Sequence, residues 1–207
     1  MIKAITTTRY IDDETQQEYV FMPLDDTIII EDTEKGHKVK YLTQDEQPTS
    51  PDEDGDRYVF LVHYHRDFQI ERETVPAEIL GQWYNGEKPE ELDKYHVFAV
   101  SALIHSGVWL SLSKKFVFDP GGWDTSHVGA SCVTRKEFGS GGVEFEHTRD
   151  EAETIAKSLL DTWNQYLQGD VYCCVVEHSE GGKQVGYDVV GGFYGLDYAR
   201  ECLKNEF

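Results

Sequence analysis

Two histidines on either side of a tyrosine, His63 and His65, are the residues whose type and spacing come nearest to a metal site. The residues around them are rich in β-branched and aromatic side chains and predict a strand, on which both imidazoles would point to one face. Such a pair can hold a metal ion if a third ligand arrives from elsewhere. His105, Asp124 and His127 are candidates, but no spacing selects one of them. Because the histidines could equally line a half-buried sheet face, we assign no metal ligand and no cofactor.

A second segment whose residues could take part in a reaction is the glycine-rich stretch DPGGWDTSHVG at residues 119–129. Its proline and two adjacent glycines favour a tight turn. Ser126 and His127 follow as neighbours on the chain, without the GxSxG turn that exposes a serine nucleophile. The segment also lacks the spacing and the lysine of a phosphate-binding loop. It therefore predicts a structural turn, and no residue is assigned a catalytic role.

The balance of charge excludes several classes of partner. The 207 residues include 39 acidic and 19 basic ones, which gives a formal net charge of −20. A protein that holds DNA or RNA by its phosphates needs clustered Lys and Arg, whereas the densest basic pairs are Lys114-Lys115 and Arg135-Lys136. An anionic membrane surface would also repel the chain. We therefore expect no direct nucleic-acid binding and no membrane binding, and a basic protein surface as the favoured partner.

Short runs of carboxylates concentrate in residues 1–56, which hold 15 acidic and 5 basic residues. Runs of this kind commonly form a solvated face that keeps a protein soluble. Carried on strands and loops, they can also approximate the charge spacing of a nucleic acid and occupy a basic groove on another protein. On that second interpretation, the candidate partner-binding residues are Asp12, Asp13, Glu14, Asp25, Asp26, Asp45, Glu46, Asp52, Glu53, Asp54 and Asp56.

The order of the predicted elements favours an α+β fold. Runs rich in apolar and β-branched residues predict strands, among them 19–22, 27–31, 39–42, 58–65, 95–105, 171–177 and 184–190. For 95–105, Ala99, Ala102 and Leu103 also allow a helix. The clearest helix covers about 149–168, where Thr148 and Glu151 form a capping box and an apolar stripe follows at helical spacing. Short helices are expected at 76–84 and 196–203, and the turn residues Glu180-Gly181-Gly182 between the runs 171–177 and 184–190 predict a β-hairpin. Since strands and helices do not alternate regularly, we expect a mostly antiparallel sheet packed by the long helix and the short C-terminal helix.

The polar segment at residues 43–56 contains two prolines and six carboxylates and predicts an exposed linker. It would separate an acidic, β-rich N-terminal subdomain and linker, residues 1–56, from a main α+β domain, residues 57–207. The N-terminus lacks the apolar core of a signal peptide, and no run is long enough to span a membrane. The four cysteines form no separated CxxC pairs and are expected to be reduced thiols. These features predict a soluble, cytoplasmic protein.

Several short motifs carry a resemblance to a known family. They are HRDF at 65–68, HSG at 105–107, WDTSHVG at 123–129, YLQGDVY at 166–172 and GGFYGLDYA at 191–199. Together they resemble a family of small acidic accessory proteins of phages and mobile elements, over about residues 57–207. The resemblance carries no established activity, so no functional residue is transferred. It implies a protein that works in the cytoplasm of a bacterial or archaeal host and, by analogy, an inhibitor of host defence such as an anti-restriction or anti-CRISPR protein.

Three functions therefore stay open. The first is a non-enzymatic inhibitor whose carboxylates imitate a nucleic acid and bind a basic surface of a host defence protein. The second is a metal-dependent hydrolase of a nucleotide or signalling molecule that uses His63, His65 and a third ligand near Asp124. The third is a structural or assembly protein of a virion, for which the sequence offers no distinguishing mark.

Overall fold

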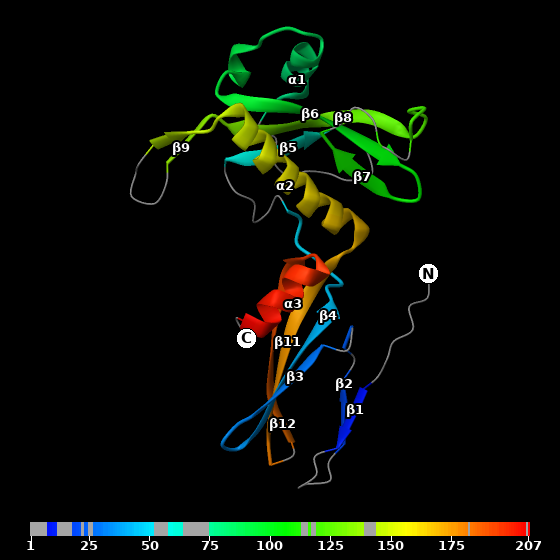
Figure 1. Ribbon diagram of the computed structural model, residues 1–207, viewed down its shortest axis with the longest axis vertical. Coiled ribbons are helices and arrows are strands. Elements are labelled where there is room, and N and C mark those ends of the chain that lie inside the picture. Colours follow the sequence, from blue (N-terminus) through cyan, green and yellow to red (C-terminus); the bar gives the residue numbers. More distant parts are fainter. Residues whose placement is uncertain are drawn as a thin grey trace. The chain divides into compact units, whose positions relative to one another are not determined.

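The computed structural model describes residues 8–11, 18–21, 23–24, 27–51, 58–63, 75–112, 116, 119–138, 144–181, 183–205 and 207. The chain divides into two compact units (Figure 1), of which unit 1 comprises Met1–Pro48 and Gly169–Phe207, and unit 2 comprises Thr49–Gln168. The expected division into 1–56 and 57–207 differs from this one, because the C-terminal segment pairs with strands of the N-terminal segment.

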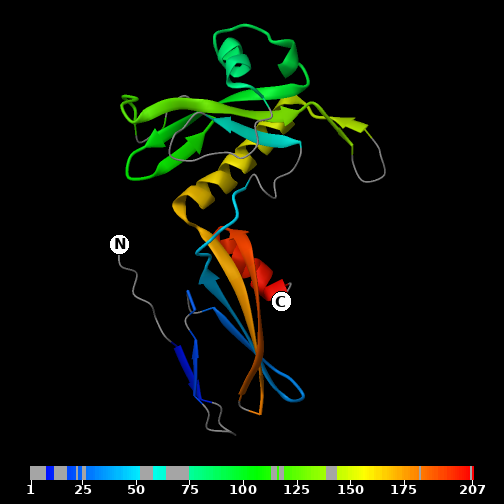
Figure 2. The same cartoon turned by 180° about the vertical axis from the view of Figure 1, so that it is seen from behind.

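Unit 2 is built on a four-stranded antiparallel sheet. Its strands lie in the order β5 (Val59–His63), β8 (Thr125–Thr134), β6 (Tyr95–Ile104) and β7 (Val108–Ser111). Helix α2 (Arg149–Gln168) lies on one face, while α1 (Ala77–Tyr84) and the short 3-10 helix η1 (Glu90–Leu92) pack against the other (Figures 1 and 2). Strands β9 (Lys136–Phe138) and β10 (Glu144–Glu146) form a separate ribbon.

Helix α2 begins and ends at the residues that the sequence predicts. The backbone N–H of Thr148 donates to the Glu151 carboxylate at 2.8 Å, and the N–H of Glu151 donates to the Thr148 hydroxyl at 3.3 Å. This reciprocal cap satisfies donors that the first helical turn would otherwise leave unpaired. Leu160 and Trp163 are buried against Leu61 and other sheet residues. Among the described helices, none is long and apolar enough to cross a membrane.

The edge of the unit 2 sheet at β7 is covered by polar side chains of α2. Asn164 bonds both backbone groups of Leu110: the Leu110 N–H donates to Asn164 Oδ1 at 2.7 Å, and Asn164 Nδ2 donates to the Leu110 carbonyl at 3.0 Å. Gln168 donates to the Val108 carbonyl at 2.9 Å. Because an edge strand otherwise presents unpaired N–H and C=O groups to other chains, these contacts close β7 to further pairing.

Unit 1 contains a second four-stranded antiparallel sheet. Its strands lie in the order β12 (Lys183–Tyr194), β11 (Val171–Glu180), β4 (Gly36–Gln44) and β3 (Ile28–Asp32). Helix α3 (Leu196–Asn205) buries Ala199 and Leu203 against Leu42 and Cys174 of one face. The predicted hairpin around residue 181 is confirmed by the pairing of β11 with β12. Strands β1 (Thr8–Ile11) and β2 (Glu18–Phe21) form a two-stranded ribbon.

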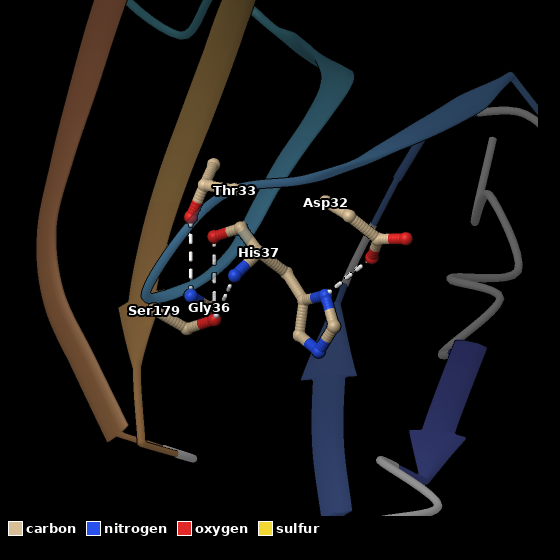
Figure 3. A network of polar contacts seen from close by, with 5 residues as sticks. All are labelled: Asp32, Thr33, Gly36, His37 and Ser179. Atoms are coloured by element: carbon tan, nitrogen blue, oxygen red, sulfur yellow. Dashed lines mark hydrogen bonds and ion pairs between the residues drawn. The ribbon is translucent and has the colours of Figure 1, made fainter.

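The turn between β3 and β4 is joined to β11 by a compact set of polar contacts (Figure 3). The Ser179 hydroxyl donates to the His37 carbonyl and accepts from the His37 N–H, both at 3.2 Å. His37 Nδ1 contacts the Asp32 carboxylate at 2.9 Å, and the Gly36 N–H donates to the Thr33 hydroxyl at 3.1 Å. A Cβ on Gly36 would meet the Ser179 carbonyl oxygen at 1.9 Å, so the close approach of these strands requires glycine.

The predicted fold class is wrong. An α+β class was expected, with a mostly antiparallel sheet packed by helix 149–168 and the C-terminal helix, but the described chain is mostly β. Its strands form two four-stranded and two two-stranded antiparallel sheets, rather than the one sheet expected. Helices α2 and α3 also belong to different units and share no sheet. Apolar alternation identifies strands and their buried faces, but it does not say which strands share a sheet.

The four cysteines are free thiols, as the sequence predicts. Cys132, Cys174 and Cys202 are buried, and Cys173 is half-buried. Burial raises the pKa of the Cys132 thiol to about 12 and, together with the neighbouring carboxylate of Asp45, raises that of Cys173 to about 11. Since the thiolate is the reactive form, these cysteines are suited to packing rather than to catalysis.

The cap on the β7 edge can be tested with Asn164→Ala. This change leaves the N–H and C=O of Leu110 without their side-chain partner, and an unsatisfied buried backbone group costs about 1–3 kcal/mol. We expect a loss of unfolding free energy of about that size, measured by urea denaturation with an unchanged m-value. Asp161→Ala, at an exposed position of the same helix, is the control and should change stability little. Equal stabilities for the two variants would contradict the assigned cap.

Candidate functional site

Helix α1 places an aromatic side chain at the margin of the unit 2 sheet. Leu80 is buried, and Trp83 packs against the same apolar cluster. The helix ends at Tyr84 with Asn85 as its C-cap, after which Gly86 adopts a φ of +94° and the chain reverses. Tyr84, on the last turn, stacks on the ring of His127 from β8, with 3.9 Å between ring centroids and 15° between planes. The pair forms a partly exposed aromatic platform.

An irregularity in the β8 strand decides where His127 points. Val100 pairs with Gly129, whereas the next residue, Ser101, pairs with His127, so Val128 is an extra residue. Val128 is buried in the cluster beside α2, while His127 meets α1. Burial lowers the pKa of His127, and a hydrogen bond with the backbone of Val100 partly opposes that shift. The imidazole is therefore uncharged at neutral pH.

A small apolar pocket lies beside the aromatic platform. Its volume is about 90 Å³, and it is lined by Leu80, Gly81, Trp83, Tyr84, His127, Gly129 and Ala130. Pockets that hold drug-sized molecules span roughly 300–1,000 Å³, and one water occupies about 30 Å³ in the liquid. This pocket therefore fits the end of one side chain from a partner better than it fits a nucleotide or a similar substrate.

A larger groove of about 440 Å³ runs between β7 and α2, lined by Leu110, Ser111, Leu112, Glu153, Lys157, Leu160 and Asp161. Lys157 and Glu153 form an ion pair at 2.7 Å, one helical turn apart. The contact with Lys157 lowers the pKa of Glu153, so this carboxylate is ionised at neutral pH. The groove thus offers an internal charge pair, and the lowered pKa of Glu153 does not suit this carboxyl to general acid catalysis.

Exposed carboxylates follow directly after the aromatic platform. Glu87, Glu90, Glu91 and Asp93 are all exposed. Leu92, between them, is buried in the same apolar cluster as Leu80 and fixes η1 on the sheet. Residues 87–93 therefore present four carboxylates and one lysine, Lys88, at the surface beside η1, and we call Glu87, Glu90, Glu91 and Asp93 the acidic segment.

The segment predicted to be a structural turn, 119–129, is organised by one buried carboxylate. Asp119 accepts hydrogen bonds from the backbone N–H groups of Trp123 and Asp124, at 3.0 and 2.9 Å, and from the Thr125 hydroxyl at 2.8 Å. Burial acts to raise the pKa of Asp119, but these hydrogen bonds outweigh it and the net pKa is lowered. Trp123 is 89% exposed at the tip of the turn. Asp119 thus has the role of holding the turn.

Most of the predicted partner-binding residues lie outside the described part of the chain. They are Asp12, Asp13, Glu14, Asp25, Asp26, Asp52, Glu53, Asp54 and Asp56. Of the two that are described, Glu46 is exposed, whereas the Asp45 carboxylate accepts from the N–H groups of Gln47 at 3.1 Å and Gly192 at 3.2 Å. Asp45 therefore has a structural role at the end of β12, and Glu46 alone is free to meet a partner in the way predicted.

The residues considered for a metal site do not form one within the described chain. His63 lies on β5 opposite Gly129, and His65 is outside the described residues. His105 contacts the Asp124 carboxylate at 3.2 Å, while His127 stacks on Tyr84. Among the described residues, no three His, Cys, Asp or Glu side chains gather as metal ligands would.

The sequence does not predict the aromatic platform. The stretch 76–84 predicts a short helix but not its contact with His127, 43 residues further on, because strand order is not encoded locally. The acidic segment has a visible signal, since residues 87–93 hold four carboxylates between a turn and a strand. The acidic runs of residues 1–56 are denser than this one.

Comparison with known proteins identifies no relative. No family model, no curated protein and no solved structure matches the chain.

The environment of His127 predicts a pH dependence. The folded protein favours the neutral imidazole, so His127 contributes stability above its unfolded pKa of 6.5, and that contribution is lost as the pH falls below this value. We expect His127→Phe, which keeps a ring beside Tyr84, to lose less stability between about pH 7.5 and pH 5.5 than the unchanged protein. Urea unfolding at both pH values measures the difference. An identical loss in both proteins would show that His127 does not titrate as described.

Proposed function

We propose that the protein is an acidic, non-enzymatic inhibitor that binds the nucleic-acid-binding surface of a partner protein and replaces phosphates there. The observation that carries the proposal is the net charge of −20. A field of this sign attracts basic protein surfaces and accelerates encounter with them. It also repels nucleic acids and anionic membranes, which makes a basic protein the most favourable macromolecular partner.

The use of the described basic side chains supports this proposal. Lys136 and Arg200 contact the neighbouring acidic residues Glu144 and Asp197, at 2.6 and 3.4 Å, and Lys40 is buried against Glu31. Lys94 and Arg149 lie over the rings of Tyr95 and Phe98. These five cations are held in local contacts and are therefore less available to neutralise acidic residues elsewhere on the surface.

Within unit 2 the acidic segment and the aromatic platform supply two complementary parts of a binding surface. The carboxylates provide long-range attraction, which governs the rate of association. The pocket beside Tyr84 can receive one side chain of the partner, and buried contacts of this kind dominate the energy of many interfaces. The platform and the acidic segment are adjacent in the chain, since Tyr84 precedes Glu87 by three residues.

The resemblance to accessory proteins of phages and mobile elements suggests the setting for this activity. An inhibitor of that origin would act in the cytoplasm of a bacterial or archaeal host, and its target would be a nucleic-acid-binding defence protein, as anti-restriction and anti-CRISPR proteins have. Candidate partners are therefore to be sought in the lysate of such a host.

The proposal predicts that Glu87→Gln, Glu90→Gln and Glu91→Gln together weaken partner binding. The partner is first captured from host lysate in a salt series and then measured with purified components. Loss of three charges should slow association and flatten its dependence on salt concentration. Duplex DNA or RNA should compete with this protein for the captured partner.

The control triple variant is Asp161→Asn, Glu180→Gln and Glu201→Gln, which removes three charges from exposed positions elsewhere. It should reduce the salt dependence less than the first variant does. A third variant that neutralises Asp52, Glu53, Asp54 and Asp56 compares residues 52–56 with the acidic segment. If all three variants keep the original affinity and salt dependence, and nucleic acid does not compete, the proposed function is wrong.

A further inference from the structure

The strand β12 stands out when the four edges of the two larger sheets are compared. At one edge of unit 2, β7 is closed by Asn164 and Gln168. The other edge, β5, is five residues long, as is β3 at one edge of unit 1. Strand β12 has 12 residues and, among the described strands, β11 is its one neighbour. It is therefore the long edge for which the described residues supply no cover.

The side chains on this edge are apolar to an unusual degree for so acidic a chain. Val185, Tyr187, Val189 and Val190 are exposed by 57, 65, 50 and 44%. From Gln184 to Tyr194 the strand carries a single charge, that of Asp188. Natural edge strands are commonly protected by charged side chains, bulges or short length. Since β12 is long and carries one charge between Gln184 and Tyr194, pairing of its regular stretch with another strand would bury apolar side chains and satisfy its outer backbone groups.

The apolar residues of β12 continue a row that crosses the whole sheet. Val189 pairs with Val175, Val175 with Tyr41, and Tyr41 with Ile28, so these four side chains lie side by side on one face. Val175 and Tyr41 are buried in the interior of the row, while Val189 at its end is half exposed. A further strand beside β12 would extend this row and cover its exposed end.

We propose that β12 is a dimerisation edge, at which a second copy of this chain adds its own β12 in antiparallel orientation. The favoured register places Tyr187 opposite Tyr187 of the partner subunit. Val185 then lies opposite Val189 of the partner subunit, and Asp188 lies opposite Gly186 of the partner subunit. Cross-strand aromatic and β-branched pairs of this kind stabilise a sheet.

The register is decided by charge and by strand regularity. A two-fold axis at Asp188 would bring two like charges face to face, which is unfavourable, whereas an axis at Tyr187 separates them. The pairing of β12 with β11 is continuous from Gly186 to Val190 and irregular on both sides. This regular stretch contains the proposed axis. Because the two strands are identical, the contact is self-complementary and closes as a dimer.

Sedimentation of the full chain over a concentration series tests the proposal. We expect a monomer–dimer equilibrium that shifts toward dimer as salt rises, because salt screens the repulsion between two chains of charge −20. The proposed binding of a basic partner has the opposite salt dependence. The two proposals can therefore fail separately. A chain that stays monomeric at both low and high salt would overturn the dimer.

Two substitutions on the edge locate the contact. Tyr187→Lys with Val189→Lys should weaken the dimer more than about tenfold, because burial of unpaired charge is costly. The matched control is Trp109→Lys with Tyr198→Lys, at positions 48 and 56% exposed, and it should leave the dimer intact. Circular dichroism of both variants establishes that they are folded. A dimer that survives the β12 changes would contradict the assigned edge.

The register is tested by oxidation of a Tyr187→Cys variant. The two-fold axis brings this position against its own copy, so mild oxidation should give a covalent dimer in most of the protein. Tyr198→Cys, at a position on α3 that is 56% exposed against 65% for Tyr187, should cross-link far less. Equal cross-linking of the two variants, or none at position 187, would overturn the register. The native cysteines are predominantly buried and contribute little background.

Discussion

The pairing of β4 with β11 is the constraint on which unit 1 depends. Nine residue pairs, from Gly36 with Glu180 to Gln44 with Tyr172, join strands that are separated by the whole of unit 2 in the sequence. Strand β3 attaches to one side of this pair, β12 to the other, and α3 covers it through Leu203 and Leu42. Closing so long a loop costs conformational entropy before any contact forms. The continuous pairing and the buried row through Tyr41 and Val175 offset that cost.

This long-range closure also explains which parts of the fold could be read from the sequence. Helix α2 was predictable to its end residues, because the Thr148–Glu151 cap and the apolar stripe are local signals. The β11–β12 hairpin was predictable for the same reason, since its turn residues stand between two β-rich runs. The fold class was not predictable, because the sequence around β4 contains nothing that specifies a partner 128 to 144 residues away. Such pairing is decided by the sum of the apolar contacts.

The candidate site, like the fold, was predictable from the sequence only in part. The surplus of carboxylates is a property of composition and could be recognised at once, and the acidic segment is part of it. The individual roles of carboxylates could not be recognised, because Asp45 resembles any exposed acid in the sequence yet bonds the backbone of Gly192. Asp119 likewise holds the turn that carries Trp123. A carboxylate that accepts backbone hydrogen bonds is engaged in the fold, and only the structure separates it from one that faces solvent.

Charge and apolar exposure divide the described surface between two kinds of contact. Where carboxylates are dense, as in the acidic segment, approach of a second copy is repelled and approach of a basic protein is favoured. Where charge is sparse, as along β12, the general repulsion between copies is weakest and backbone pairing can proceed. The uneven distribution of charge over the described surface therefore affects where two copies can approach each other. In the proposed dimer, repulsion over the rest of the surface would restrict self-association to the long edge that the described residues leave uncovered, and would thereby disfavour open-ended aggregation through exposed strands.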